Sequence, residues 1–285
     1  MTEGRFVLNF TPTGLIPTRE MTPHVPITPQ EIVSDVSMAA GLGASIIHLH
    51  ARDPATGEPT HDNEVYAEII RGIRTAHPAL VLCISTSGRA APDFERRSAC
   101  LDLDGDAKPD MASLTLSSLN FNRQASLNPP QIIRDLAAKM QQRGIKPELE
   151  AFDAGMINYA KYLLRKGILS TPCYFNLILG NIACAQADPL HLGLMIHDLP
   201  PDSIWSVGGV GRDQFKVHVM GLASGGGVRV GLEDNVWYDN ERTHLATNRE
   251  LLERVLGVAD AMGLAPSPPA DVRTMLDLDA PGGTE

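Results

Sequence analysis

Short apolar runs recur along the chain, and segments with a helical pattern fill most of the gaps between them. Eight runs stand out: RFVLNF, ASIIHLH, LVLCIST, MASLTL, PELEAF, CYFNLIL, SIWSVGG and GGVRVGL. Their starts lie roughly 25 to 40 residues apart, which is the spacing of repeated β-strand and α-helix units. Continuous apolar runs are typical of parallel strands that are buried on both faces.

The segments between the runs carry helix start and stop signals. Thr28 and Glu31 have the spacing of a capping box, and Pro29 stands at the first helical position. Segments 128–144 and 248–263 repeat the design, each with an asparagine as the expected cap and a glycine as the expected stop. Helices are therefore predicted between the strands.

Eight strands that alternate with helices, in a chain of 285 residues, predict a (β/α)8 TIM barrel. A doubly wound open sheet would more often carry a Gly-rich phosphate-binding turn after its first strand, and NFTPTGLIP is not such a turn. We expect residues 1–265 to form a single barrel domain. Residues 266–285 are rich in proline and predict an extended C-terminal extension that packs on a neighbouring subunit.

Composition narrows the class of protein. With 43% hydrophobic residues the chain can bury a sizeable core, and its net charge of -10 argues against nucleic-acid binding. No apolar run approaches the roughly 18 residues of a membrane-spanning helix. The four cysteines are scattered without a Cys-x-x-Cys pair, which favours a reducing, cytoplasmic setting.

Two histidines end the second run. Alternate side chains of a strand share a face, so His48 and His50 point the same way, as chelation of one metal ion requires. Glu233 follows the last run, and in a closed barrel the last and second strands flank the first. Two imidazoles and one carboxylate with an open position form a catalytic zinc set. Ordinary polar groups on the barrel rim are the alternative interpretation.

Arg229 lies four residues before Glu233, on the same face of the last predicted strand. An arginine that points into a barrel is costly to bury unless it is paired. It could form an ion pair with Glu150 or Glu233, or it could bind a substrate carboxylate through two hydrogen bonds. We favour binding of the substrate carboxylate.

Asp234 is adjacent to a predicted ligand without being needed as one, which makes it the natural general base. The structural alternatives are a helix N-cap or a partner for Arg212 or Arg52. Other strands end in polar residues that face the same predicted mouth: Ser85, Ser113, Thr115 and Glu150.

Several motifs between Asn9 and Asn235 together resemble the β-keto acid cleavage enzymes, whose type member is the 3-keto-5-aminohexanoate cleavage enzyme. They are PTG, PITPQEI, IIHLHARDPATGEPTHD, ISTSG, MASLTLSSLNF, ELEAFDAG and VGLEDN. The resemblance implies a TIM barrel with one zinc ion per subunit, usually a homotetramer. It also implies condensation of a β-keto acid with acetyl-CoA, which gives acetoacetate and a new acyl-CoA.

The same resemblance assigns roles to the residues that match the motifs. It implies His48, His50 and Glu233 as zinc ligands, Asp234 as the acid/base with Arg229 and Ser85 beside it, and Ser113, Thr115, Glu150 and Arg229 in the substrate pocket. One departure concerns the first strand, where the family type member has an acidic residue and this chain has Ile16. Because an apolar side chain cannot pair with an ammonium group, an amino-substituted keto acid is not expected as substrate.

Two alternatives come from other classes. Metal-dependent hydrolases of the amidohydrolase type are also barrels with His-x-His, but they carry that pair on the first strand. A metal-stabilised binding or scaffold barrel without turnover is the other, and the predicted Arg-Glu-Asp cluster argues against it because buried charge is costly.

Overall fold

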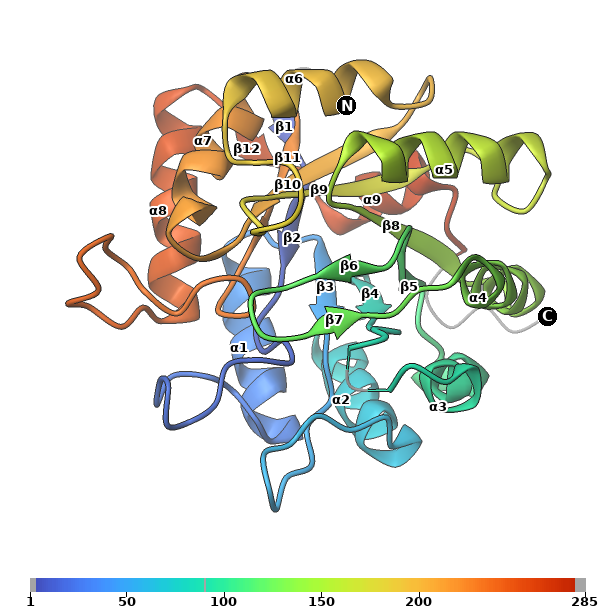
Figure 1. Ribbon diagram of the computed structural model, residues 1–285. Coiled ribbons are helices and arrows are strands. Elements are labelled where there is room, and N and C mark those ends of the chain that lie inside the picture. The colour runs from blue at the N-terminus through green and yellow to red at the C-terminus, as the bar shows by residue number, and fades with distance from the viewer. Residues whose placement is uncertain (1–3, 90, 280–285) are drawn as a thin grey trace.

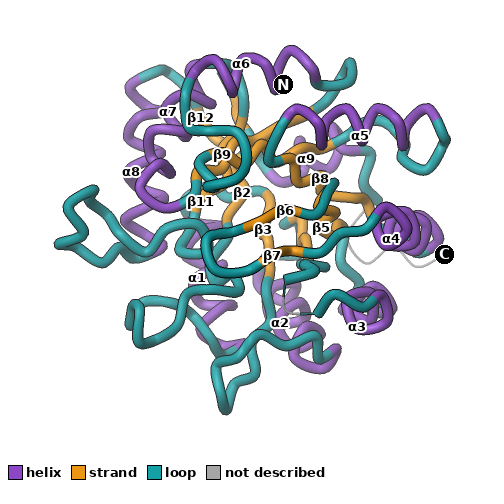
Figure 2. The backbone as a smooth tube through the Cα atoms, in the orientation of Figure 1, coloured by secondary structure: helices purple, strands orange, loops and turns teal. Residues whose placement is uncertain are grey.

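The computed structural model describes residues 4–89 and 91–279, and its centre is a closed barrel of parallel strands (Figures 1 and 2). In order around the barrel the strands are β2 (Leu8–Phe10), β3 (Ile46–Leu49), β4 (Val81–Ile84), β5 (Met111–Thr115), β8 (Lys146–Ala151), β9 (Tyr174–Leu179), β10 (Ile204–Gly209) and β11 (Gly227–Val230). β11 pairs with β2 and closes the ring. The predicted (β/α)8 barrel is confirmed.

Helices surround the barrel in Figure 1. They are α1 (Pro29–Gly41), α2 (Asn63–Ala76), α3 (Phe94–Ser98), α4 (Pro130–Gln142), α5 (Ala154–Arg165), α6 (Pro189–Asp198), α7 (Gln214–Ala223) and α8 (Asn248–Ala261). In the described part of the chain, none of the helices combines the length and apolar character needed to cross a membrane.

The helix caps follow the expected chemistry in one case and depart from it in two. α1 has the predicted capping box of Thr28 and Glu31. α8 is capped by Thr247 rather than by Asn248, whose side chain instead accepts a hydrogen bond from the Leu232 N–H. Asn128 does not cap α4 either, because its side chain is used to tie loops together at the barrel mouth.

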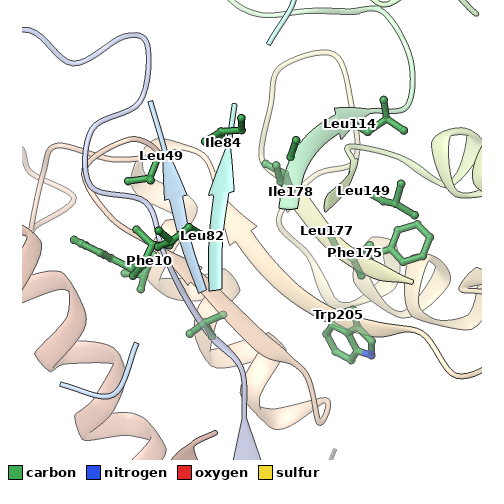
Figure 3. Packing of buried hydrophobic residues seen from close by; sticks show 14 of the residues in the cluster. Phe10, Leu49, Leu82, Ile84, Leu114, Leu149, Phe175, Leu177, Ile178 and Trp205 are labelled. Carbon is green, nitrogen blue, oxygen red and sulfur yellow. The ribbon is translucent and has the colours of Figure 1, made fainter. Parts of the chain in front are cut away.

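The apolar core has two layers. The larger one fills the space between the outer faces of the strands and the helices, where Figure 3 shows side chains such as Leu114, Leu149 and Phe175. The smaller layer lies inside the barrel at the end where the strands begin. Its members are Val7, Ile46, Val81, Cys83, Met111, Tyr174, Val272 and Leu276.

The C-terminal segment closes this floor of the barrel. β12 (Ala265–Pro266) pairs with β1 (Arg5–Phe6), and α9 (Pro269–Leu276) places Val272 and Leu276 against the inner layer. The extended conformation expected for residues 266–285 is therefore wrong for α9, and residues 280–285 lie outside the described part. Packing of this segment on a neighbouring subunit stays a prediction.

A short hairpin lies at the opposite end, where the strands end. It is formed by β6 (Leu119–Asn120) and β7 (Ala125–Ser126), and it crosses in front of the barrel in Figure 1. The Asn181 side chain, in the loop after β9, donates to the Asn120 carbonyl and ties the hairpin to the rim.

Candidate active site at the barrel mouth

Three predicted ligands converge at the mouth of the barrel. His48 Nε2 and His50 Nε2 lie 3.2 Å apart, and Glu233 Oε1 lies 3.1 Å from His50 Nε2 and 4.0 Å from His48 Nε2. His48 lies on β3 and His50 directly follows this strand, two positions on and with its ring on the same side, whereas Glu233 comes from the loop after β11. Because β2 is the one strand between β3 and β11 in the barrel, the ends of β3 and β11 are close enough for the three groups to meet.

The chemistry of this donor set fits a divalent ion such as zinc. Burial lowers the pKa of His50 to about 4, so that its ring is neutral and has a lone pair to donate. The second oxygen of Glu233 is buried without a hydrogen-bond partner among the described residues. A buried carboxylate oxygen without a partner is costly, and a bound cation would satisfy it.

Gly14 allows the loop after β2 to pass close beside Glu233. A Cβ at Gly14 would lie 2.5 Å from Glu233 Cγ, and the backbone there has φ +67°. Both the space and the conformation therefore require glycine.

Glu148 orients the first histidine. Its Oε2 lies 2.5 Å from His48 Nδ1, and its Oε1 accepts a 2.8 Å hydrogen bond from the side chain of Asn9. Burial opposes its charge, but the His48 ring and these hydrogen bonds outweigh burial and lower the pKa of Glu148 to about 2. Because the carboxylate only accepts, Nδ1 carries the proton and Nε2 is left for a metal.

The described residues contain a second group with metal-ligand geometry, formed by His48, Cys83 and Glu148. It uses the other nitrogen of the His48 ring, which already donates to Glu148. Burial and the adjacent Glu148 carboxylate raise the pKa of the Cys83 thiol well above its usual value. A thiol that stays protonated is a poor zinc ligand, so we assign this group to the support of His48.

Arg229 lies at the centre of the carboxylates. Its Nη2 donates to Glu233 Oε1 at 2.6 Å and its Nε donates to Asp234 Oδ2 at 3.0 Å. Nη1 lies 3.6 Å from Glu150 Oε1 and is buried without a hydrogen bond to the described residues. Arg229 thus forms ion pairs and also keeps donor capacity for a ligand.

His218 on α7 supports this arginine from behind. Its Nε2 lies 2.7 Å from the Arg229 carbonyl oxygen. Burial lowers the pKa of His218 to about 4, so that the ring is neutral and adds no further positive charge to the site.

Asp234 has the environment of a proton acceptor. Burial raises the pKa of Asp234 to about 6, because Arg229 only partly offsets the burial and Glu233 adds repulsion. Its side chain pairs with Arg229 and not with Arg212 or Arg52, the partners considered from sequence. A carboxylate with a pKa near neutrality matches the requirement for a general base.

The remaining candidates lie on neighbouring strands around the same mouth. Thr115 Oγ1 donates to Glu150 Oε2 at 2.7 Å, and Ser85 is buried directly after the end of β4. Ser113 Oγ accepts a 3.1 Å hydrogen bond from the Thr86 N–H, so this hydroxyl also has a structural role. The structure brings all predicted residues to one end of the barrel, and their roles stay predictions.

Two buried arginines fix the loops around the mouth. Arg52 donates to the carbonyl oxygens of Gly14, Pro17 and Gly57. Arg97 donates to the carbonyl oxygens of Thr86 and Leu127 and to the Asn128 side chain. Sequence reasoning missed these roles, as it missed that of Glu148.

A sequence model of the beta-keto acid cleavage enzyme matches residues 5–278, nearly the whole chain. The chain belongs to the beta-keto acid cleavage enzyme family. The family and the enzyme class predicted from the motifs are therefore confirmed.

Curated relatives agree with this membership. The 3-keto-5-aminohexanoate cleavage enzyme of Fusobacterium nucleatum subsp. nucleatum is 36% identical over 263 residues, which cover 92% of this chain and 93% of that protein. The 3-oxoadipate:acetyl-CoA acetyltransferase of Cupriavidus necator is 35% identical over 270 residues, which cover 93% of this chain and 92% of that protein. The family thus contains proteins named for different β-keto acids.

A solved structure supports the fold of this family member. The ternary complex of ObcA with a C4-CoA adduct and oxalate superimposes with a TM-score of 0.77 at 22% sequence identity, and the match covers 90% of this chain and 68% of that chain. At this identity the likeness carries the fold alone.

Proposed function

We propose that this family member is a zinc-dependent acyltransferase that condenses a β-keto acid with acetyl-CoA to give acetoacetate and a new acyl-CoA. The observation that carries the proposal is the convergence of His48, His50 and Glu233 beside Arg229, whose Nη1 has no hydrogen-bond partner in the described part of the chain. A chelated keto acid needs both features, a cation for its oxygens and a cationic side chain for its carboxylate.

His48, His50 and Glu233 would hold the ion, and Glu148 keeps the His48 ring in the tautomer that can bind it. When bound, the ion supplies a Lewis acid that polarises the keto group of the substrate. Arg229 binds the substrate carboxylate through Nη1, while its other nitrogens remain on Glu233 and Asp234. The substrate is thereby fixed at both of its oxygen-bearing groups.

Asp234 takes the proton from the carbon between the ketone and the carboxylate, the most acidic carbon of a β-keto acid. Its raised pKa, about 6, places the ionised base and its conjugate acid within reach of neutral pH. Acetoacetate retains the carboxylate of the substrate and the carbon next to it. This carbon must therefore form a bond to the carbonyl carbon of the acetyl group. CoA leaves the acetyl carbon as a thiolate and then adds to the keto carbon of the substrate. The bond between that keto carbon and the newly acetylated carbon breaks, which gives the new acyl-CoA, and Asp234 returns its proton to the departing acetoacetate carbon.

We also propose that zinc is the resident metal at one ion per subunit, that the protein is cytoplasmic and that it forms a homotetramer.

Ile16 lies in the loop after β2 and is 46% exposed. With an apolar side chain at this position, a substrate that carries an ammonium group there is disfavoured. A hydrolase of the amidohydrolase type is not favoured, because the histidine pair lies at the end of β3, the second barrel strand in chain order, and not at the end of the first.

The test is a product analysis with acetyl-CoA and a panel of β-keto acids that includes 3-oxoadipate, 3-oxohexanoate and 3-keto-5-aminohexanoate. We expect the zinc-loaded protein to form acetoacetate and an acyl-CoA in equal amounts from at least one acid. Protein from which a chelator has removed the metal should form neither product. Free CoA thiol without a new thioester would indicate hydrolysis and contradict the proposal.

A further inference from the structure

The arginines at the barrel mouth fall into two kinds. Arg52 and Arg97 donate through all three groups of their guanidinium to protein oxygens, and they serve as loop ties. Arg229 has one nitrogen, Nη1, that forms no hydrogen bond to the described residues. Arg89 goes further: within residues 4–89 and 91–279 its guanidinium forms neither an ion pair nor a hydrogen bond, and its Nε is buried without a partner.

Aromatic packing fixes the position of Arg89. It follows β4 in the same loop as Ser85, and its guanidinium carbon lies 3.5 Å from the ring centroid of Phe121. Phe121 extends from the β6–β7 hairpin and packs edge-on against Phe152, with ring centroids 5.8 Å apart. Arg89 is therefore held between the hairpin and the barrel rim rather than extended into solvent.

The charges near Arg89 are those of the active site. Burial lowers the pKa of Arg89, and the carboxylates of Glu233, Glu150 and Asp234 act against that effect. These are the acidic groups that surround Arg229, so both guanidinium groups lie in the field of one acidic cluster at the barrel mouth. None of the three carboxylates is within ion-pair distance of Arg89.

We infer that Arg89 is a specificity residue that binds the far carboxylate of a β-keto dicarboxylic acid. The inference rests on the proposed function, in which the ion and Arg229 hold the keto acid end of the substrate. A partly buried cation with unused donors is costly until an anion satisfies it. A second carboxylate at the other end of the substrate would supply that anion in the planar, two-pronged geometry that a guanidinium matches.

The phosphates of CoA are the competing anions. They lie a whole pantetheine arm away from the thioester, which must react beside Asp234. Arg89 is close enough to Glu233 and Asp234 for their charges to affect its pKa, and the hairpin packs over it. A group on the reacting substrate fits this position better than a distant phosphate.

The experiment compares two six-carbon β-keto acids that differ only in the far group, 3-oxoadipate and 3-oxohexanoate. Dissociation constants are measured by calorimetry on the metal-loaded protein without acetyl-CoA, so that binding is read without turnover. The kcat/KM for each acid and the KM for acetyl-CoA are then measured. The variants are R89Q, R89K and the matched control R123Q, which removes an exposed arginine from the β6–β7 hairpin that packs over Arg89.

We expect the wild type and R123Q to bind the diacid at least about 10-fold more tightly than the monoacid. R89Q should weaken diacid binding by about 10- to 100-fold and change monoacid binding by less than about 3-fold. R89K keeps the positive charge but cannot form the bidentate interaction, so its affinity for the diacid should lie between those of the wild type and R89Q. The KM for acetyl-CoA should not change.

A wild type without preference for the diacid overturns the inference, whether or not the variants fold. Equal losses for both acids in R89Q assign Arg89 a structural role and also overturn it. A rise in the KM for acetyl-CoA instead assigns the residue to a CoA phosphate. If the predicted binding pattern appears but no acyl-CoA forms with any β-keto acid, the proposed reaction fails and the role of Arg89 stands.

Discussion

The two ends of the barrel interior are built by the same strands and differ completely in character. On β3 the inward face runs from Ile46 at the floor to His48 near the mouth, and on β5 it runs from Met111 to Ser113. The floor is apolar and closed by α9, whereas the mouth holds several charged groups around Arg229. On these two strands, the packing that supplies stability and the polar groups that supply chemistry are thus only two residues apart.

Of the substitutions that distinguish the mouth from the floor, His48→Ala is expected to have the largest effect. Loss of one of three ligands should abolish stable metal binding and reduce kcat/KM by about 10³-fold or more, because the site then lacks its Lewis acid. Metal content and turnover are measured on the same preparation. His197→Ala on the exposed face of α6 is the matched control, and equal metal content in both variants would contradict the ligand assignment.

Asp234→Asn should keep the metal and reduce kcat by about 10²-fold or more, since the amide cannot accept the proton. Metal content separates this outcome from that of His48→Ala. A wild-type rate in the variant would place the base elsewhere.

The pH profile of the wild type sharpens the same assignment. Burial raises the pKa of Asp234 to about 6, and the carboxylate is the active form. The kcat/KM should therefore fall as the pH drops through about 6, or through a lower value with the dication bound, and this acid limb should be absent from Asp234→Asn. An unchanged acid limb in the variant would assign it to another group.

At the floor, Leu276→Ala should reduce the free energy of unfolding by about 2–4 kcal/mol and leave kcat/KM within about 3-fold of the wild type. Leu276 is fully buried against the inner apolar layer, at the opposite end of the barrel from the predicted metal ligands. Thr274→Ala on the exposed side of α9 should change stability by only about 0.5 kcal/mol. Denaturant unfolding and turnover measured together would reveal any dependence of the mouth on the floor.

Glu148→Gln is expected to have the smallest effect, because it lies between the two ends and acts only through His48. The variant should weaken metal affinity by about 10- to 100-fold without removing a ligand. Cys83→Ala removes the other donor to the same carboxylate oxygen, and it should change metal affinity far less. A competitive metal titration measures both, and equal losses in the two variants would favour Cys83 as a ligand.

The strands and the three convergent side chains could be predicted from sequence because polar residues at the ends of apolar runs mark the mouth of a barrel. Glu148 carried a signal that was overlooked. It stands two residues before Glu150 in PELEAF, so both share the inward face of one strand, and a charged residue inside an apolar run needs a buried partner. His48 is that partner.

Other features depend on contacts that no local pattern contains. Arg52 and Arg97 are loop ties because backbone carbonyls from distant loops happen to face them. The prolines before α9 suggested an extended chain, yet Pro269 is in the first turn of a helix, where it is tolerated. Val272 and Leu276, four residues apart, were the helical signal in that segment.

The most direct test is a crystal structure of the zinc-loaded protein with anomalous diffraction measured at the zinc edge. We predict one strong peak per chain, within bonding distance of His48 Nε2, His50 Nε2 and a Glu233 oxygen. A peak on His48 Nδ1, Cys83 and Glu148, or no peak in a protein that retains full activity, would contradict it.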